Sequence, residues 1–323
     1  MRMDTNGWMA VRTSGWIGLW LACVLSASPT ALADLIGITG GKVLVDGKAR
    51  DLSSVLYRID AATGMATMIG PTGFQNVGAL AVHPLTGRIY AHRNDRTTQV
   101  GGQLLELDSQ TGQAMLIGDT QIGVPDMTFD SSGNLYAWLQ QGSFAGFGSL
   151  SRQLVRLDTS TAAVAPMQPS GLNVNQVGLA FAPDGTLYMK SGDPDASQPI
   201  VDQRGALFTL DASTGLGTFQ TWLSGEPANA LTFGPGGHAF TVDRNTGESV
   251  LQTIDLQTGE LTNIGSIRDA STGDLLQITS IAGATAVPEP QTWGFILVMS
   301  ASFFRSRHHR PKVASRLPRR GVR

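Results

Sequence analysis

The chain has 323 residues, of which 41% are hydrophobic and 15% are charged, and this composition excludes a disordered or low-complexity protein. Residues 34–286 carry 13 Lys and Arg against 23 Asp and Glu, a net charge of −10 that argues against nucleic acid as a partner. The only cysteine, Cys23, precedes this acidic body, which excludes disulfides and cysteine zinc sites from it.

Residues 1–33 have the three parts of a secretory signal peptide. Arg2 and Arg12 form a basic start, residues 16–25 form an apolar stretch, and Ala31 and Ala33 frame a small-x-small cleavage site before Asp34. The apolar stretch is shorter than the ~20 residues that a membrane-spanning helix needs, so a retained anchor helix is the weaker alternative. The sequence therefore predicts export, with a mature chain that begins at Asp34.

A short hydrophobic run followed by Asp-x-x-Thr, usually with Gly next, occurs five times. Consecutive Asp residues are 48, 50, 53 and 44 positions apart, so this is an internal repeat. An Asp side chain accepts hydrogen bonds from backbone N–H groups inside a turn, and Gly takes the left-handed conformation that a tight hairpin requires. Each copy is thus predicted to be a strand that runs into a hairpin. The copies are residues 56–64, 104–112, 154–162, 207–215 and 251–259.

A second repeated element precedes four of these hairpins: an apolar strand, a Gly-containing turn, and a strand that ends in an aliphatic–aromatic pair, as in residues 80–90. Together the two elements make four strands in up-and-down order, and such units repeating every 44–53 residues are typical of a β-propeller. Residues 34–39 and 277–281 resemble a second and a first strand that lack their partners, so we expect them to pair. The prediction for 34–286 is an all-β propeller of five four-stranded blades, with a solenoid or two-sheet sandwich as the alternative.

The innermost strands of the predicted blades carry small side chains, as crowding near the axis of a narrow ring requires. Our alignment of the five strands places one row toward the axis and a second row two residues later. The first row is Ala79, Asp126, Gly178, Ala230 and Gln277, and the second is Ala81, Thr128, Ala180, Thr232 and Thr279.

Loop lengths divide the predicted ring into two faces. The turns between first and second strands and between third and fourth strands are short and uniform, whereas the other connections vary in length. Variable loops on a rigid scaffold usually carry binding surfaces, so we predict a binding face on that side. Its aromatic and basic candidates are Phe74, Trp138, Phe144, Phe147, Trp222, Arg93 and Arg96.

Asp126 suggests a metal site at the channel mouth of the same face. It could meet the amides of Asn76, Asn175, Asn229 and Gln277, and one carboxylate among amide oxygens is a set that Ca²⁺ accepts. The set resembles the metal centre of propeller lactonases in residue type only, and a channel closed by hydrogen-bonded amides is the other interpretation. The sequence has no G-x-S-x-G, H-E-x-x-H or P-loop motif, so no catalytic residue is assigned.

Residues 287–323 form a separate C-terminal segment. Val287-Pro288-Glu289-Pro290 precedes an apolar stretch at 293–304, predicted to be a short hydrophobic helix, and a tail with eight Lys and Arg. This order of parts resembles the PEP-CTERM sorting domain of Gram-negative bacteria, although the apolar stretch is shorter and the tail longer than usual. The resemblance implies an exosortase-like processing enzyme as a partner, transient anchoring in the inner membrane through 293–304, and delivery to the cell surface or extracellular space.

Together these features predict an exported, surface- or matrix-associated binding module, and the sorting resemblance implies an association with extracellular polysaccharide. The repeats are also similar to those of secreted bacterial propellers, a likeness that concerns fold and not activity. The alternative is a secreted, lactonase-like, metal-dependent hydrolase with its site around Asp126. Ca²⁺ is the one cofactor that the sequence suggests.

Overall fold

The structure is a computed structural model, and it describes residues 34–45, 48–95, 101–140, 152–172, 174, 177–191, 205–225, 230–243 and 248–283. The chain separates into two units, Met1–Val287 and Pro288–Arg323, and all described residues belong to the first. The predicted signal peptide and the C-terminal sorting segment with its short helix therefore lie outside the described residues. In the described part, no helix combines the length and the apolar character that crossing a membrane requires.

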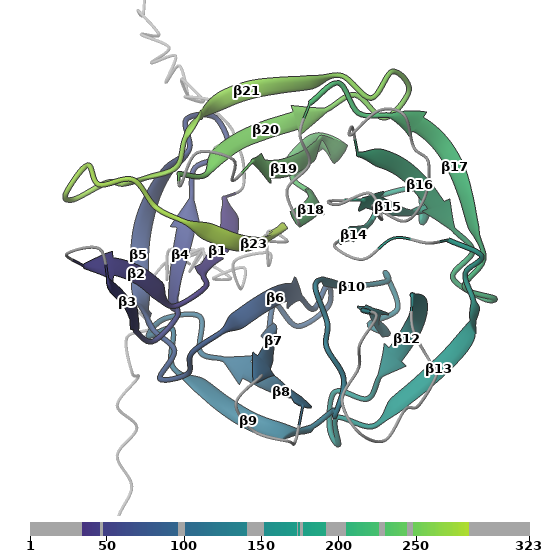
Figure 1. Cartoon of the computed structure of the whole chain (residues 1–323), viewed down its shortest axis with the longest axis horizontal. Helices are drawn as coiled ribbons and strands as arrows, with labels where there is room; N and C mark the ends of the chain where they lie inside the picture. Colours follow the sequence, from purple (N-terminus) through teal and green to yellow (C-terminus); the bar gives the residue numbers. More distant parts are fainter. Residues whose placement is uncertain are drawn as a thin grey trace, which may run out of the picture. The chain divides into compact units, whose positions relative to one another are not determined.

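The first unit is a ring of antiparallel sheets, the blades, in which the first strand of each lies near the axis and the last at the outer rim (Figure 1). Four blades consist of consecutive strands. Blade 1 is β6 (Val77–Val82), β7 (Ile89–Asp95), β8 (Gly101–Leu107) and β9 (Ala114–Asp119); blade 2 is β10 (Met127–Phe129), β11 (Leu135–Leu139), β12 (Gln153–Leu157) and β13 (Val164–Pro169). Blade 3 is β14 (Val177–Phe181), β15 (Leu187–Ser191), β16 (Ala206–Leu210) and β17 (Gly217–Trp222); blade 4 is β18 (Ala230–Phe233), β19 (Ala239–Asp243), β20 (Val250–Ile254) and β21 (Leu261–Ser266).

Blade 5 is built from both ends of the described chain. From the axis outward its main strands are β23 (Ile278–Gly283), β1 (Leu35–Thr39), β4 (Val55–Ile59) and β5 (Met65–Pro71). β1 and β23 pair antiparallel, with Leu35 opposite Gly283. The predicted five-bladed propeller, closed by pairing of the terminal strands, is confirmed. Closure pairs two strands that would otherwise be exposed edges.

Four small elements were not predicted from the sequence. β2 (Lys42–Val45) and β3 (Lys48–Asp51) form a hairpin between β1 and β4, and a 3₁₀ helix, η1 (Pro235–Gly237), forms a turn of blade 4. β22 (Arg268–Asp269) pairs parallel with β5 and covers the outer edge of blade 5. It leads into a sixth Asp turn, in which Asp269 Oδ1 accepts the N–H of Ser271 at 2.8 Å.

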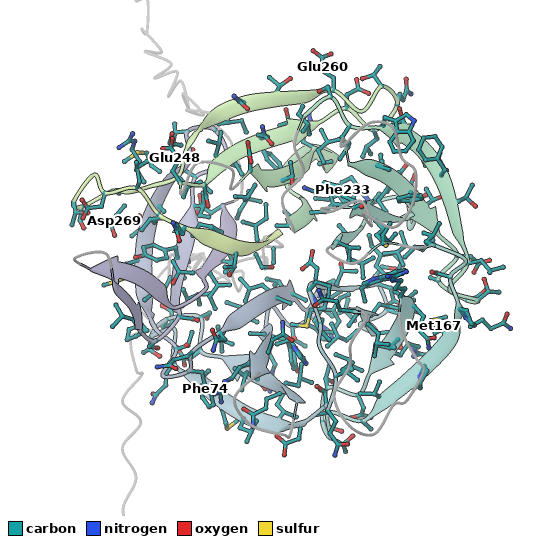
Figure 2. All side chains as sticks on the ribbon, viewed as in Figure 1. Phe74, Met167, Phe233, Glu248, Glu260 and Asp269 are labelled. Carbon is teal, nitrogen blue, oxygen red and sulfur yellow. The ribbon has the colours of Figure 1, made fainter. Side chains whose placement is uncertain are left out.

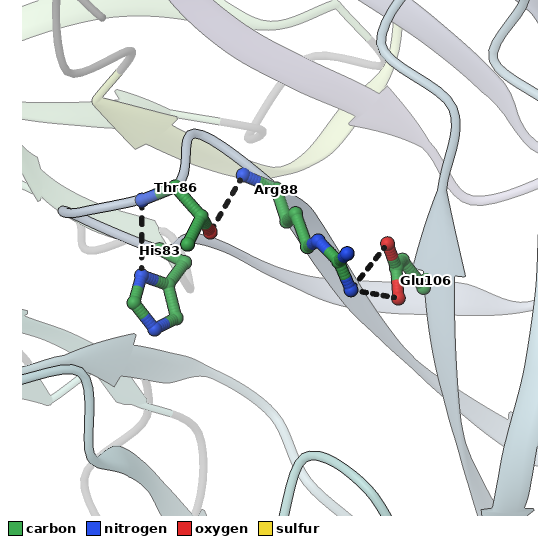
Figure 3. Close-up of polar contacts among 4 residues, drawn as sticks. All are labelled: His83, Thr86, Arg88 and Glu106. Atoms are coloured by element: carbon green, nitrogen blue, oxygen red, sulfur yellow. Dashed lines mark hydrogen bonds and ion pairs between the residues drawn. The ribbon is translucent and has the colours of Figure 1, made fainter.

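The repeated Asp residues hold the hairpin turns as predicted. Asp108 Oδ1, for example, accepts the N–H groups of Gln110 and Thr111, both at 2.8 Å. In the first turn of blade 1, the imidazole of His83 plays the same part. Its Nδ1 accepts the N–H of Leu85 at 3.2 Å and the N–H of Thr86 at 3.3 Å. Figure 3 shows the bond to Thr86. These turns depend on local hydrogen-bond acceptors and not on packing, so they can be predicted from the sequence.

The five repeated hairpins, 60–64, 108–112, 158–162, 211–215 and 255–259, also join neighbouring blades, and we call them the clasps. Each lies against the outer strand of the preceding blade; Ser224 N–H, for example, donates to the carbonyl of Gly259 at 2.9 Å. Gly259 has φ +76°, and a Cβ there would overlap the carbonyl oxygen of Trp222. Glycine is therefore required both for the left-handed backbone and for close approach to the neighbouring blade. Ala162 replaces glycine in blade 2, where the facing residue is Gly118.

The hydrophobic core lies between blades and includes a repeated aromatic pair. Tyr90 of blade 1 packs edge-on against Phe129 of blade 2 with ring centroids 5.4 Å apart, and Tyr136 packs against Phe181 of blade 3 at 5.3 Å. Tyr188 and Phe233 continue the pattern into blade 4. Such pairs contribute about 0.5–1.5 kcal/mol each beyond the area they bury. The periodic apolar residues are therefore core residues that hold one blade against the next.

The predicted register of the innermost strand of blade 5 was wrong by three residues. Ala282 lies opposite Ile36, in the position that Ala81 takes opposite Tyr90 in blade 1. The first axial row is thus completed by Ser280 and the second by Ala282, not by Gln277 and Thr279. Pairing with β1 sets this register, and the small residues of β23 satisfy either alignment when read alone.

Candidate functional site

Asp126 occupies the centre of the ring, just before β10, and is almost completely buried. Its Oδ1 accepts the N–H of Met127 at 3.0 Å, and its Oδ2 accepts the N–H of Leu179 in blade 3 at 2.8 Å. The N–H of Leu231 in blade 4 and the hydroxyl of Ser280 in blade 5, at 3.4 Å, also donate to this carboxylate. Ser280 Oγ in turn accepts the N–H of Leu80 in blade 1 at 3.0 Å. One carboxylate and one hydroxyl therefore connect the innermost strands of all five blades.

Two opposing effects act on the proton affinity of Asp126. Burial disfavours the charged carboxylate and raises its pKa well above the ordinary value, while the donated hydrogen bonds from the three N–H groups and Ser280 act in the opposite direction. Burying this carboxylate is thus costly, and hydrogen-bond donors surround both of its oxygens. This arrangement is typical of a side chain that stabilises the fold.

Lys190, on β15, is a second buried ionisable residue near the axis, and it was not predicted from the sequence. Its side chain is fully buried, and Nζ donates to Thr241 Oγ1 in blade 4 at 2.7 Å, while that hydroxyl donates to the carbonyl of Ala230 at 2.6 Å. Burial lowers the pKa of Lys190 to about 7, against the attraction of Asp126 and Asp243. The signal available in the sequence was a lysine at a strand position where other blades carry Trp138 or Val242.

A cavity of about 600 Å³ lies on the axis beyond Asp126 and is lined by the second axial row. The row consists of small residues: Ala81, Thr128, Ala180, Thr232 and Ala282. Its rim is formed by the short turns, including Pro84 and Pro183. This hollow therefore opens on the face opposite the variable loops that we predicted to be the binding face.

The structure brings together only part of the predicted binding face. Phe74 is half-buried (Figure 2). The Arg93 guanidinium lies 5.7 Å from its ring centroid, and Arg93 Nη1 donates to Gln103 Oε1 at 3.0 Å. Trp138 does not belong to an exposed face, because it is fully buried in the core between blades 2 and 3. Phe144, Phe147 and Arg96 lie outside the described residues.

The predicted Ca²⁺ site does not fit the described residues. Both oxygens of Asp126 accept N–H donors, and the same lone pairs cannot also face a cation. Asn76 has a left-handed backbone at φ 58° in the turn before β6, while Asn175 and Asn229 lie outside the described residues. Among the residues that the structure describes, no three His, Cys, Asp or Glu side chains gather as metal ligands.

Trp222 takes a different position from the one predicted. It ends β17 at the outer rim and is 43% exposed, and its ring centroid lies 5.1 Å from that of Phe219, which is 46% exposed. Phe219 was not predicted from the sequence, because an aromatic residue in a strand is usually a core residue.

Comparisons with known proteins do not assign a function. No protein-family model matches the chain, and no curated protein matches it in sequence. Among solved structures, TolB from Acinetobacter baumannii is similar with a TM-score of 0.42 and 16% identity, over 71% of this chain and 51% of that one, so the match spans about half of TolB. A chain of a nidogen/laminin complex scores 0.48 with 11% identity over 77% of this chain and 97% of that one. A gluconolactonase from Xanthomonas campestris scores 0.43 with 15% identity over 73% and 77%. These similarities are too low to argue for binding or for hydrolysis.

Proposed function

We propose that this protein is an exported, non-enzymatic binding module that is delivered to the cell surface or the extracellular matrix and associates there with polysaccharide. The observation that carries the proposal is the saturation of Asp126. The acid at the centre of the ring accepts donors from blades 2, 3, 4 and 5, so it holds the scaffold together and is not available for chemistry.

The competing hydrolase hypothesis requires the same carboxylate as a metal ligand. A lactonase-like site needs an open coordination position and oxygen ligands that face it. Rotating Asp126 toward a cation would leave the buried N–H groups of Met127, Leu179 and Leu231 without an acceptor, at about 1–3 kcal/mol each. The binding module is therefore the better-supported proposal.

Export and sorting rest on the two ends of the chain. We propose that the protein is cleaved before Asp34, held transiently in the inner membrane by 293–304, and released by an exosortase-like enzyme that acts near Val287-Pro288-Glu289-Pro290. The two prolines keep this segment out of helices and ladders, which suits the cleft of a protease, and Glu289 adds one charge for recognition. A twelve-residue helix spans only ~18 Å of a ~30 Å hydrocarbon layer, so anchoring should be weak.

The sorting proposal is tested in a Gram-negative host that carries such an enzyme. Mass spectrometry of the surface fraction should find a mature N-terminus at Asp34 and no peptide from 305–323. Glu289→Ala should accumulate uncut in the membrane, whereas Glu260→Ala, an exposed substitution in blade 4, should be processed normally. An intact tail on the surface protein would refute the sorting assignment.

Calorimetric titration of residues 34–286 with Ca²⁺ separates the two functions. We expect no saturable heat. Saturable binding that disappears in Asp126→Asn would instead favour the hydrolase.

A further inference from the structure

The outer strand of blade 3, β17, departs from the pattern of the other four outer strands. In each blade a β-bulge interrupts the pairing of the third and fourth strands. In the other blades an aliphatic residue at the bulge packs against the core: Ile69, Ile117, Met167 and Ile264. In β17 the bulged residue is Gln220, which is exposed.

The bulge places two aromatic rings on the same side of β17. Phe219 lies opposite Phe208, and Trp222 lies opposite Ala206, so the extra residue brings positions that are three apart onto one face. The Phe219 ring packs at 5.9 Å, edge-on, against Phe208, and at 5.1 Å against Trp222. Gln220 Nε2 donates to Thr209 Oγ1 at 2.9 Å, which holds the bulge in place. The pair is therefore ordered before any ligand arrives.

Neither the fold nor the core requires this pair. The positions of Phe219 and Trp222 are filled by Met68 and Pro71 in blade 5, by Pro166 and Pro169 in blade 2, and by Asn263 and Ser266 in blade 4. All five outer strands are described, and an exposed aromatic pair occurs in β17 alone. Two large rings that remain nearly half exposed indicate an interaction surface.

We infer that Phe219 and Trp222 form a platform for a neutral polysaccharide, an assignment that rests on the proposed binding function and locates it. Residues 216–222 contain no charge, and residues 34–286 carry −10, so an anionic polymer or a second copy of the chain would be repelled. A sugar ring presents an apolar face of C–H groups that the negative face of an aromatic ring attracts. The polar side chains of Gln220 and Thr221 are bonded within the protein, to Thr209 Oγ1 and to the carbonyl of Thr258, so the binding surface of the platform is the two rings themselves. Because the rings are preordered, little conformational entropy is lost on binding.

The test uses native gels cast with neutral hydroxyethylcellulose or dextran, or with anionic alginate, and full-length protein purified in a mild detergent. The variant Phe219→Asn with Trp222→Ser copies the outer strand that blade 4 already carries, so the fold tolerates it. The matched control is Met68→Asn with Pro71→Ser at the same positions of blade 5. We expect a neutral polymer to retard the wild type and the control. The platform variant should bind the same polymer at least about tenfold more weakly.

Three results would overturn the inference. If the platform variant is retarded like the wild type, polysaccharide binds elsewhere and the proposed function stands without this site. If neutral polymers retard no variant while the protein still associates with extracted extracellular matrix, the ligand class is wrong and the binding function survives. If light scattering finds a dimer that the platform variant abolishes, the occupant is a second copy of the chain.

Discussion

Replacement of Asp126 by alanine should destabilise the whole ring, because its carboxylate accepts backbone N–H groups from three blades. Met127, Leu179 and Leu231 would each keep a buried N–H without an acceptor. An unsatisfied buried donor costs about 1–3 kcal/mol, so three of them cost roughly 3–9 kcal/mol. The burial that raises the pKa of Asp126 makes the carboxylate itself costly, which offsets part of this loss. We therefore expect the free energy of unfolding to fall by about 3–6 kcal/mol, against a total of about 5–15 kcal/mol for a typical domain.

Urea unfolding of residues 34–286, followed by tryptophan fluorescence and circular dichroism, measures this loss. Asp126→Asn keeps one carbonyl oxygen but turns an amide N–H₂ toward a backbone donor, so its midpoint should fall between those of the wild type and the alanine variant. Asp108→Ala removes a turn carboxylate with two N–H donors at the surface, where water replaces it, and should hardly move the midpoint. If Asp126→Ala unfolds at the wild-type midpoint, the carboxylate does not hold the blades together and the reasoning fails.

Three further outcomes follow from the geometry. Because burial lowers the pKa of Lys190 to about 7, the folded protein binds fewer protons than the unfolded chain between about pH 7 and 10.5. The free energy of unfolding should therefore rise with pH across this window. A similar rise in Lys190→Met would contradict the assignment of this effect to Lys190. In urea unfolding, Gly259→Ala should destabilise the protein far more than Gly273→Ala. Both glycines have a left-handed backbone, but only a Cβ at Gly259 would overlap a neighbouring blade. Equal losses of unfolding free energy would mean that the contact between this clasp and the neighbouring blade does not stabilise the fold. Deletion of residues 277–286 should lower the melting temperature sharply, since it exposes β1 as an edge, and an unchanged melting temperature would refute the closure.

The parts of the fold that sequence reasoning predicted are those set by local chemistry. An Asp that accepts the N–H groups two and three residues later needs no tertiary contact. The turns could therefore be predicted from the sequence, and with them the blades and the closing strands. The register of β23 was not, because only pairing with β1 selects Ser280 over Gln277. The sixth Asp turn at Asp269 was missed because no hydrophobic strand precedes it.

The site was harder to predict than the fold. Asp126 was identified as unusual, but its role depends on N–H groups that are 53 and more residues away along the chain. Lys190 looked like an ordinary polar residue at the end of a strand, and only blade packing buries it. Phe219 and Trp222 are three apart in a strand, so strict alternation places them on opposite faces, and only the bulge at Gln220 unites them.

Asp126 is the single carboxylate among the described residues of the first axial row, and it makes the five blades unequal. Blade 2 supplies the acceptor, and the other blades place Ala79, Gly178, Ala230 or Ser280 at the same level. A ring assembled from five copies of blade 2 would crowd five acids together at its centre, where like charges oppose ionisation. A ring of five copies of blade 3 would have N–H groups that point toward the axis and no side-chain acceptor for them. Divergence of the repeats at this one position is therefore a condition for closing the ring, and a symmetrised version of this propeller would need a different solution at its axis.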